Sequence, residues 1–214
     1  MALTRGEIVD AAVALIDESG LQGLTLRSLA SRLGVSAPTL YWHVKDKRHL
    51  LDLVAQYVVG GFRTPGTEEP APGQPVWDWL ADRARDQRAA LLAHRDSALV
   101  VAGNRPTGDA MPAIERTLRV LVGAGCGPGE AVRVLTALGS FVIGDALETQ
   151  TAQARPDGVE HTPGSADPDA YPTLAAAFAD VGGDEERFEE GLALLVDGLR
   201  TRLERRARSG GPPN

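Results

Sequence analysis

The amino-acid sequence predicts an all-α protein, and three observations carry that prediction. Apolar residues recur three and four positions apart along the longer segments, which places them on one face of a helix. No stretch of useful length alternates apolar and polar residues as a half-buried strand does. Residues that cap helices, chiefly Ser, Thr, Asp and Gly, stand at the ends of the apolar stripes. We therefore expect helices packed on helices.

The N-terminal part of the chain contains four predicted helices. Each begins at a residue whose side chain can accept a hydrogen bond from a free backbone amide. The first also has a glutamate three positions on, as a capping box requires. The first two end at glycines, which adopt the left-handed conformation of a C-terminal cap without strain. The predicted starts are Thr4, Thr25, Ser36 and Asp46, and the predicted ends are Gly20 and Gly34.

A proline-rich segment divides the chain into two domains. Residues 64–75 contain four prolines and cannot continue a helix, so we expect a linker there. It joins an N-terminal domain over 1–63 to a C-terminal helical bundle over 76–214. Apolar stripes in the bundle predict helices near 76–93, 106–124, 130–150 and 184–206, with a loop over 151–172.

Composition excludes several classes of protein. No segment has the roughly 18 to 20 consecutive apolar residues that cross a bilayer. The segment MALTRGEIVD turns polar and acidic at once and does not resemble a secretory signal. The single cysteine, Cys126, excludes an internal disulfide framework and fits a reducing compartment. We expect a cytoplasmic protein with no membrane partner.

Charge is distributed unevenly along the chain. The net charge is −7, but residues 1–63 carry seven Lys/Arg and six Asp/Glu, so the remainder carries −8. Within residues 27–48, five basic residues accompany one acidic residue, Asp46. A basic patch at one end of an acidic body permits that end to bind the phosphate backbone of a nucleic acid.

Residues 25–47 form a predicted helix-turn-helix. The second helix is supported by the first yet open to solvent, so its N-terminal half can enter a DNA major groove. Leu29, Val35 and Leu40 would face inward. The outward residues of the second helix are short or flat, which lets its backbone approach base edges: Ala37, Pro38, Thr39, Tyr41 and His43. The neighbouring basic residues Arg27 and Lys47 would also contact DNA. The helix N-termini at Thr25 and Asp46 would direct partial positive charge toward phosphates.

The stretch GLTLRSLASRLGVSAPTLYWHVKDKRHLL resembles the DNA-binding domain of the TetR family of bacterial transcription regulators. LLAHRD, GNRPT and ALETQ resemble core segments of tetracycline-responsive members in the same order, so the resemblance spans nearly the whole chain. It implies a ligand-responsive regulator that binds double-stranded operator DNA. An enzyme is not expected, because no nucleophile, base and orienting group stand together in the sequence and no phosphate-binding loop is present.

Seven positions face the operator in the family, and here they hold Arg27, Ala37, Pro38, Thr39, Tyr41, His43 and Lys47. The resemblance implies that Tyr41 and Lys47 mainly hold phosphates, while Arg27, Ala37 and Pro38 lie against bases. Tetracycline-responsive members have glutamine in place of Ala37, which can bind adenine with two hydrogen bonds, whereas alanine can only touch a thymine methyl. The operator should therefore differ at that base pair. We expect Trp42 to pack against the protein.

The resemblance also implies a homodimer, and the sequence supports one. The apolar stripe from Phe188 to Leu203 is long for a terminal helix that covers a single core. Glycine costs about 1 kcal/mol relative to alanine inside a helix, and close approach of helices at an interface would offset that cost. The glycines concerned are Gly139, Gly144, Gly191 and Gly198. The alternative is that a chain with 24 glycines simply tolerates them.

The C-terminal domain of the family is a small-molecule receptor. Its tetracycline-responsive members hold a magnesium chelate with two histidines and an asparagine, whose positions here are Arg63, Val101 and Arg83. Valine cannot ligate a metal, and the four histidines lack ligand spacing. We therefore expect no metal, no cofactor and an effector other than tetracycline. The predicted cavity, apolar with a few polar anchors, is lined by Trp79, Arg83, Gln87, Val101, Asn104, Arg105, Met111, Ile114, Thr117, Leu135 and Leu138.

Some alternatives stay open at this point. Arg83 and Arg105 would favour a carboxylate or a polyphenolic anion if they face inward, but arginines commonly lie on the surface, and Trp79 can equally belong to the core. The sequence predicts a repressor that binds a palindromic operator as a homodimer and releases it when a small molecule binds. A transcriptional activator and a small-molecule-binding protein with a vestigial DNA-binding domain are the alternatives.

Overall fold

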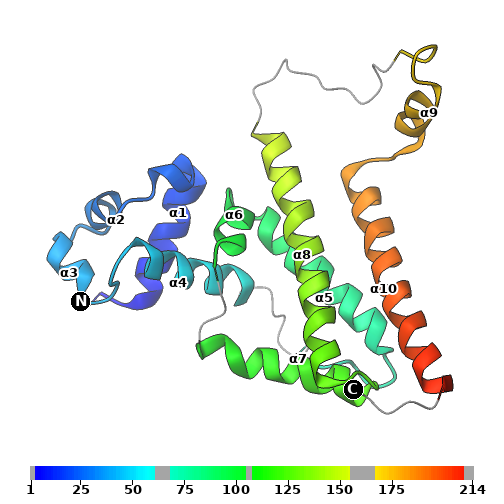
Figure 1. Ribbon diagram of the computed structural model, residues 1–214. Coiled ribbons are helices and arrows are strands. Elements are labelled where there is room, and N and C mark those ends of the chain that lie inside the picture. Colours follow the sequence, from blue (N-terminus) through cyan, green and yellow to red (C-terminus); the bar gives the residue numbers. More distant parts are fainter. Residues whose placement is uncertain (1–2, 61–67, 105–107, 155–166, 210–214) are drawn as a thin grey trace.

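The computed structural model describes residues 3–60, 68–104, 108–154 and 167–209, and the predicted all-α fold is confirmed over these ranges (Figure 1). The N-terminal helices are α1 (Arg5–Gly23), α2 (Leu26–Leu33), α3 (Ala37–Tyr41) and α4 (Lys47–Gly60). The later helices are α5 (Val76–Leu92), α6 (Ser97–Ala102), α7 (Met111–Gly123), α8 (Pro128–Gln153), α9 (Pro172–Asp180) and α10 (Asp184–Ser209). None of these helices is long and apolar enough to span a membrane.

The predicted cap residues begin the N-terminal helices. The Thr4 side chain accepts a hydrogen bond from the Glu7 amide at 3.2 Å, and the Glu7 carboxylate accepts one from the Thr4 amide at 2.8 Å. The bond from the Thr4 amide lowers the pKa of Glu7 below its ordinary value. At the start of α4, Asp46 Oδ1 accepts from the His49 amide at 2.8 Å. Gly34, between α2 and α3, has φ +65°, the left-handed value that glycine adopts without strain.

Several helix boundaries differ from those expected. Gly20 kinks α1 with φ +72°, but the helix resumes and ends at Gly23. α3 ends at Tyr41, and α7 begins only at Met111, after a short 3₁₀ helix over Gly108–Ala110. The sequence does not predict α6 or α9. α6 has six residues, too few to show a repeat, and α9 buries no residue, so its apolar positions form no core-facing stripe.

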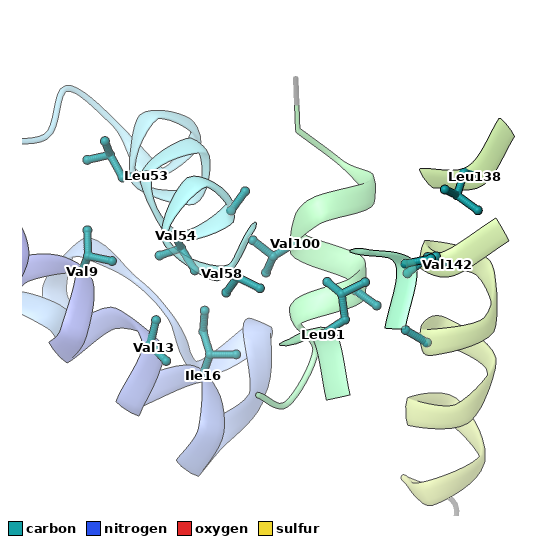
Figure 2. Packing of buried hydrophobic residues seen from close by; sticks show 14 of the residues in the cluster. Val9, Val13, Ile16, Leu53, Val54, Val58, Leu91, Val100, Leu138 and Val142 are labelled. Carbon is teal, nitrogen blue, oxygen red and sulfur yellow. The ribbon is translucent and has the colours of Figure 1, made fainter. Parts of the chain in front are cut away.

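One buried apolar cluster runs from α1 and α2 into the C-terminal domain. α4 packs against α1 on one side and against α5 and α6 further along. Figure 2 shows Val54 and Val58 of α4 between Val13 of α1 and Val100 of α6. Val58 and Val100 are 1% and 2% exposed. A change in the angle between the two domains must therefore repack this shared core, because close-packed interiors leave few voids to absorb a shift.

Polar contacts hold the end of α1 against the turn between α5 and α6. The Arg95 amide donates to Asp17 Oδ1 at 2.9 Å, and His94 Nδ1 lies 2.9 Å from Asp17 Oδ2. In return, the Leu21 amide donates to Asp96 Oδ2 at 2.7 Å, just after the kink in α1. This exchange satisfies a backbone amide that the kink leaves free. The two domains are thus joined at α1 as well as at α4.

A buried arginine ties α10 to α5 and α8. Arg88 is 6% exposed, and its guanidinium lies 2.6 Å from Asp145 Oδ2 and 2.5 Å from Glu185 Oε2. Its charge also sits 4.4 Å from the Phe188 ring centroid, and that ring stacks on Phe141 at 5.4 Å. Burial by itself would lower the pKa of Arg88, but hydrogen bonds and charge from the two carboxylates raise it above its ordinary value. Arg88 therefore stays charged and needs both partners.

The Asp145→Asn substitution tests this dependence. It leaves a buried guanidinium with only Glu185, whose side chain is 74% exposed. Breaking a fully buried pair costs roughly 3–5 kcal/mol, so with one partner retained we expect the free energy of unfolding to fall by about 2 kcal/mol. Urea unfolding at fixed protein concentration measures the difference.

Glu18→Gln is the matched control. It removes a carboxylate that also binds an arginine with two hydrogen bonds, at 2.6 and 2.8 Å from Arg32, but that carboxylate is 60% exposed. Exposed pairs contribute about 0–1 kcal/mol. Equal losses in the two variants would contradict the role assigned to burial of Arg88.

Candidate DNA-binding surface and ligand cavity

α3 presents its predicted outward residues to solvent. Ser36 caps the helix by accepting from the Thr39 amide at 3.4 Å, and Leu40 and Val44, 1% and 0% exposed, anchor its inner side. Tyr41 is 55% exposed. Among the residues predicted to contact DNA, His43 is half-buried. The others are exposed: Thr25, Arg27, Ala37, Pro38, Thr39, Tyr41 and Lys47. They lie on α2, on α3 and at the start of α4.

Ion pairs occupy two of the five basic residues in this region. Arg32 is hydrogen-bonded to Glu18, which raises the pKa of Arg32 and lowers that of Glu18. Arg48 Nε lies 3.6 Å from Asp52 Oδ1 within α4. Arg27, Lys45 and Lys47 are exposed and make no ion pair with the residues that the structure describes. The charge available to phosphates is therefore smaller than the sequence count suggests, and it borders α3.

Trp42 does not pack against the protein as expected. Its side chain is 88% exposed, because it follows the last residue of α3 and its neighbours Leu40 and Val44 fill the inward positions. Spacing alone could have placed it outside, since a helical residue two positions from an anchoring leucine points away from the core. Its apolar character misled the sequence interpretation. A large exposed indole thus borders the candidate DNA-binding surface.

A cavity of about 430 Å³ lies among α4, α5, α6, α7 and α8. A volume of this size falls within the range of small-molecule sites. Its wall is mainly apolar, with amides, carboxylates and one guanidinium among the lining side chains. The predicted lining residues that the structure brings together there are Arg83, Gln87, Val101, Asn104, Ile114, Thr117, Leu135 and Leu138.

The other three predicted lining residues fall elsewhere. Trp79 is 2% exposed and belongs to the core, where its ring supports the Arg83 guanidinium at 5.4 Å. Met111 begins α7 with half of its surface exposed and does not line the cavity. Arg105 lies outside the described residues, as does Arg63, one of the positions matched to the metal ligands. No group of three metal-ligating side chains occurs in the part of the chain that the structure describes.

The sequence interpretation missed the contribution of α4 to the cavity. Asp52, Ala55, Gln56, Val59 and Gly60 all line it, although their helix was assigned to the DNA-binding domain. They recur three and four positions apart, beside the stripe that packs on α1, so a second face was visible in the pattern. Because the domain boundary was placed at the proline-rich linker, after this helix, the sequence interpretation did not consider α4 as part of the cavity.

Family comparisons agree with this geometry. Residues 8–54 match the model described as bacterial regulatory proteins, tetR family, and residues 69–203 match the tetracyclin repressor-like C-terminal domain. The chain is 39% identical to the tetracycline repressor protein class A from transposon 1721 of Escherichia coli, over 91% of this chain and 89% of that protein.

Solved structures are similar over almost the whole chain. The Streptomyces coelicolor TetR family protein ActR in complex with actinorhodin has a TM-score of 0.82 and 29% identity, covering 95% of this chain and 99% of that one. The class A TetR in complex with 5a,6-anhydrotetracycline and magnesium has a TM-score of 0.71 and 33% identity, covering 93% and 99%. These relatives are regulators and not enzymes. The chain belongs to the TetR family of ligand-responsive bacterial transcription regulators.

Proposed function

We propose that this protein is a cytoplasmic, homodimeric repressor that holds a palindromic operator with α3 and releases it when a small molecule fills the cavity. The observation that carries the proposal is the double role of α4. Its first residue, Lys47, belongs to the candidate DNA-binding surface, and its later turns, from Asp52 to Gly60, form one wall of the cavity. A rigid helix that belongs to both sites gives each site a mechanical route to the other.

Ala37, Pro38 and Thr39 open α3 and would lie deepest in the major groove, where small side chains let the backbone approach the bases. Tyr41 and Lys47 would hold phosphates on either side. With alanine at the first position of α3, a thymine methyl is the contact that fits that base pair. In a two-fold dimer, the two copies of α3 would enter major grooves one DNA turn apart, roughly 34–36 Å.

Apolar surface left open in the single chain supports the homodimer. Leu194 of α10 is 77% exposed, and α9 buries no residue although it carries Leu174 and is preceded by Tyr171, which are 44% and 61% exposed. Such surface is costly in water, and a second copy would cover it. Gly144 and Gly198 face open space, as an interface would require.

The other two glycines have reasons within the chain. A Cβ on Gly191 would meet the Phe141 ring at 2.9 Å, so this glycine allows α8 and α10 to approach each other in one subunit. Gly139 lines the cavity. The dimer proposal therefore rests on Gly144, Gly198 and the exposed apolar residues of α9 and α10.

Release of DNA follows from linkage. A ligand shifts the equilibrium between two conformations only by its difference in affinity for them. A ligand that pushes α4 away from α5 would rotate the N-terminal domain about the shared core at Val58 and Val100. The spacing between the two copies of α3 would then change. The Asp17 and Asp96 contacts to the α5–α6 turn would transmit the same motion to α1.

The Lys47→Ala variant tests the DNA-binding surface. With DNA from the region upstream of its own gene, we expect the affinity at physiological salt to fall roughly ten-fold. The slope of log K against log salt should become shallower by about 2, one unit for each subunit's phosphate contact. Gel shifts over a salt series measure both quantities.

Arg119→Ala is the control, since it removes a basic residue that is exposed on α7, away from α3. Its affinity and salt slope should match those of the wild type. An unchanged Lys47→Ala variant would refute the assigned surface. A wild-type protein without specific binding at physiological salt would instead favour a small-molecule-binding protein, and stimulation of transcription by the bound protein would favour an activator.

The Leu194→Asp variant tests the dimer. A buried, unpaired carboxylate in each subunit should dissociate the interface, so light scattering on a sizing column should give the 22.6 kDa chain mass in place of twice that mass. Val122→Asp, which changes a residue 41% exposed on α7, should remain dimeric. A dimeric Leu194→Asp variant would place the interface elsewhere.

A further inference from the structure

Two carboxylates and one guanidinium line the described wall of the cavity. Asp52 comes from α4, and Asp86 and Arg83 come from α5. The Arg83 guanidinium lies 5.4 Å from the centroid of the Trp79 ring and keeps its positive charge there. Asp86 is half-buried and makes no hydrogen bond or ion pair with the residues that the structure describes. With two carboxylates against one guanidinium, the net charge of the described wall is negative.

An amide on the same wall adds a further acceptor. Asn104 Nδ2 donates to the Leu51 carbonyl of α4 at 3.3 Å and also to the Val100 carbonyl of α6. The reverse orientation would place Oδ1 against two carbonyl oxygens, so the donors fix the amide as it stands. Oδ1 is buried and accepts no hydrogen bond from the residues that the structure describes. An acceptor left in this state is costly, and a donor brought by a ligand would remove that cost.

We propose that the effector carries a protonated amine, which Asp86 and Asp52 hold by charge-assisted hydrogen bonds and which the apolar wall covers with ring or aliphatic contacts. This inference rests on the proposed function, since it assigns the chemistry of the effector at the cavity already described. It replaces the expectation of an anion, which depended on Arg83 and Arg105. Arg83 stacks on Trp79, and two carboxylates stand on the same wall.

A cation at Asp52 also has a route to the DNA-binding surface. The Asp52 carboxylate lies 3.6 Å from Arg48 Nε, one turn closer to the start of α4. An ammonium group in the cavity competes with Arg48 for that carboxylate. Arg48 follows Lys47 directly, so losing this partner changes the charge arrangement at the end of α4 that faces DNA. The effector would thus act through the charge pair as well as through displacement of the helix.

Two planar probes of the same three-ring shape separate the charge classes. 9-Aminoacridine is a cation at neutral pH, and anthracene-9-carboxylate is an anion of similar size. Titration of the DNA-free dimer by calorimetry avoids intercalation of the acridine into DNA. We expect the cation to bind at least ten-fold more tightly than the anion in 150 mM salt. Equal affinities, or tighter binding of the anion, would overturn the proposal.

Two substitutions on α5 show whether the cation binds in the cavity. Asp86→Asn should weaken the cation at least five-fold and leave the anion unchanged or tighter. Asp78→Asn removes the same charge from an exposed position outside the cavity wall and should bind both probes like the wild type. Equal losses in the two variants would mean that the acidic surface, not the cavity, attracts the cation, and would refute the assignment. Thermal melts of both variants confirm that each is folded.

Operator binding without any probe tests the proposed function separately. Wild type and Asp78→Asn should both shift the operator, whatever the charge preference of the cavity. If the operator shifts and the anion wins, the assignment of a protonated amine fails while the regulator stands. If no operator shifts, the proposed function fails, and with it the role of the cavity as an effector site.

Discussion

The packing of α4 between α1 and α6 is the contact on which the rest of the structure depends. Val54 and Val58 are almost fully buried, and they join the core of the small N-terminal domain to that of the larger one. Two domains joined only by a linker would turn freely. Here a turn must repack a close-packed core, so two arrangements of the domains can be distinct states and not points on a continuum. That property makes a small cavity able to control a distant surface.

Electrostatics divides the chain in the same way. Exposed basic residues gather on α2, in the turn after α3 and at the start of α4, while the remaining domain is acidic and repels phosphate. Repulsion from the acidic domain would favour the proposed orientation on DNA, with α3 in contact and the cavity away from the duplex. The ion pair of Arg32 with Glu18 holds α2 against α1, and the Arg32 charge is then less available to phosphate. The positions of the charged residues therefore matter more for DNA binding than the net charge of the chain.

The sequence predicted the helices of the N-terminal domain well because the residues that cap each helix lie within a few positions of each other. The box of Thr4 with Glu7 and the left-handed Gly34 needed nothing beyond their own turns. Contacts between distant segments were out of reach, as with Arg88 and Glu185, which are 97 positions apart. The side chain of Trp42 shows a second limit, since its apolar character predicted burial where position dictated exposure. Most of the predicted cavity residues do line the cavity. The residues of α4 that line it were not predicted, because the prolines placed a domain boundary after that helix.

Similarity to tetracycline repressors extends over most of the chain, but the proposed effector chemistry rests on the residues that line this chain's own cavity. The proposed DNA contacts and the proposed effector contacts occupy different ends of α4, and the α5 wall lines the cavity alone. A substitution at Asp86 can alter which ligand fits without touching a residue that faces DNA. A substitution at Asp52 acts on both, because its carboxylate lines the cavity and pairs with Arg48. If the proposed contacts hold, substitutions on α5 can change the preferred effector without affecting DNA binding, whereas α4 must fit both the effector and the operator.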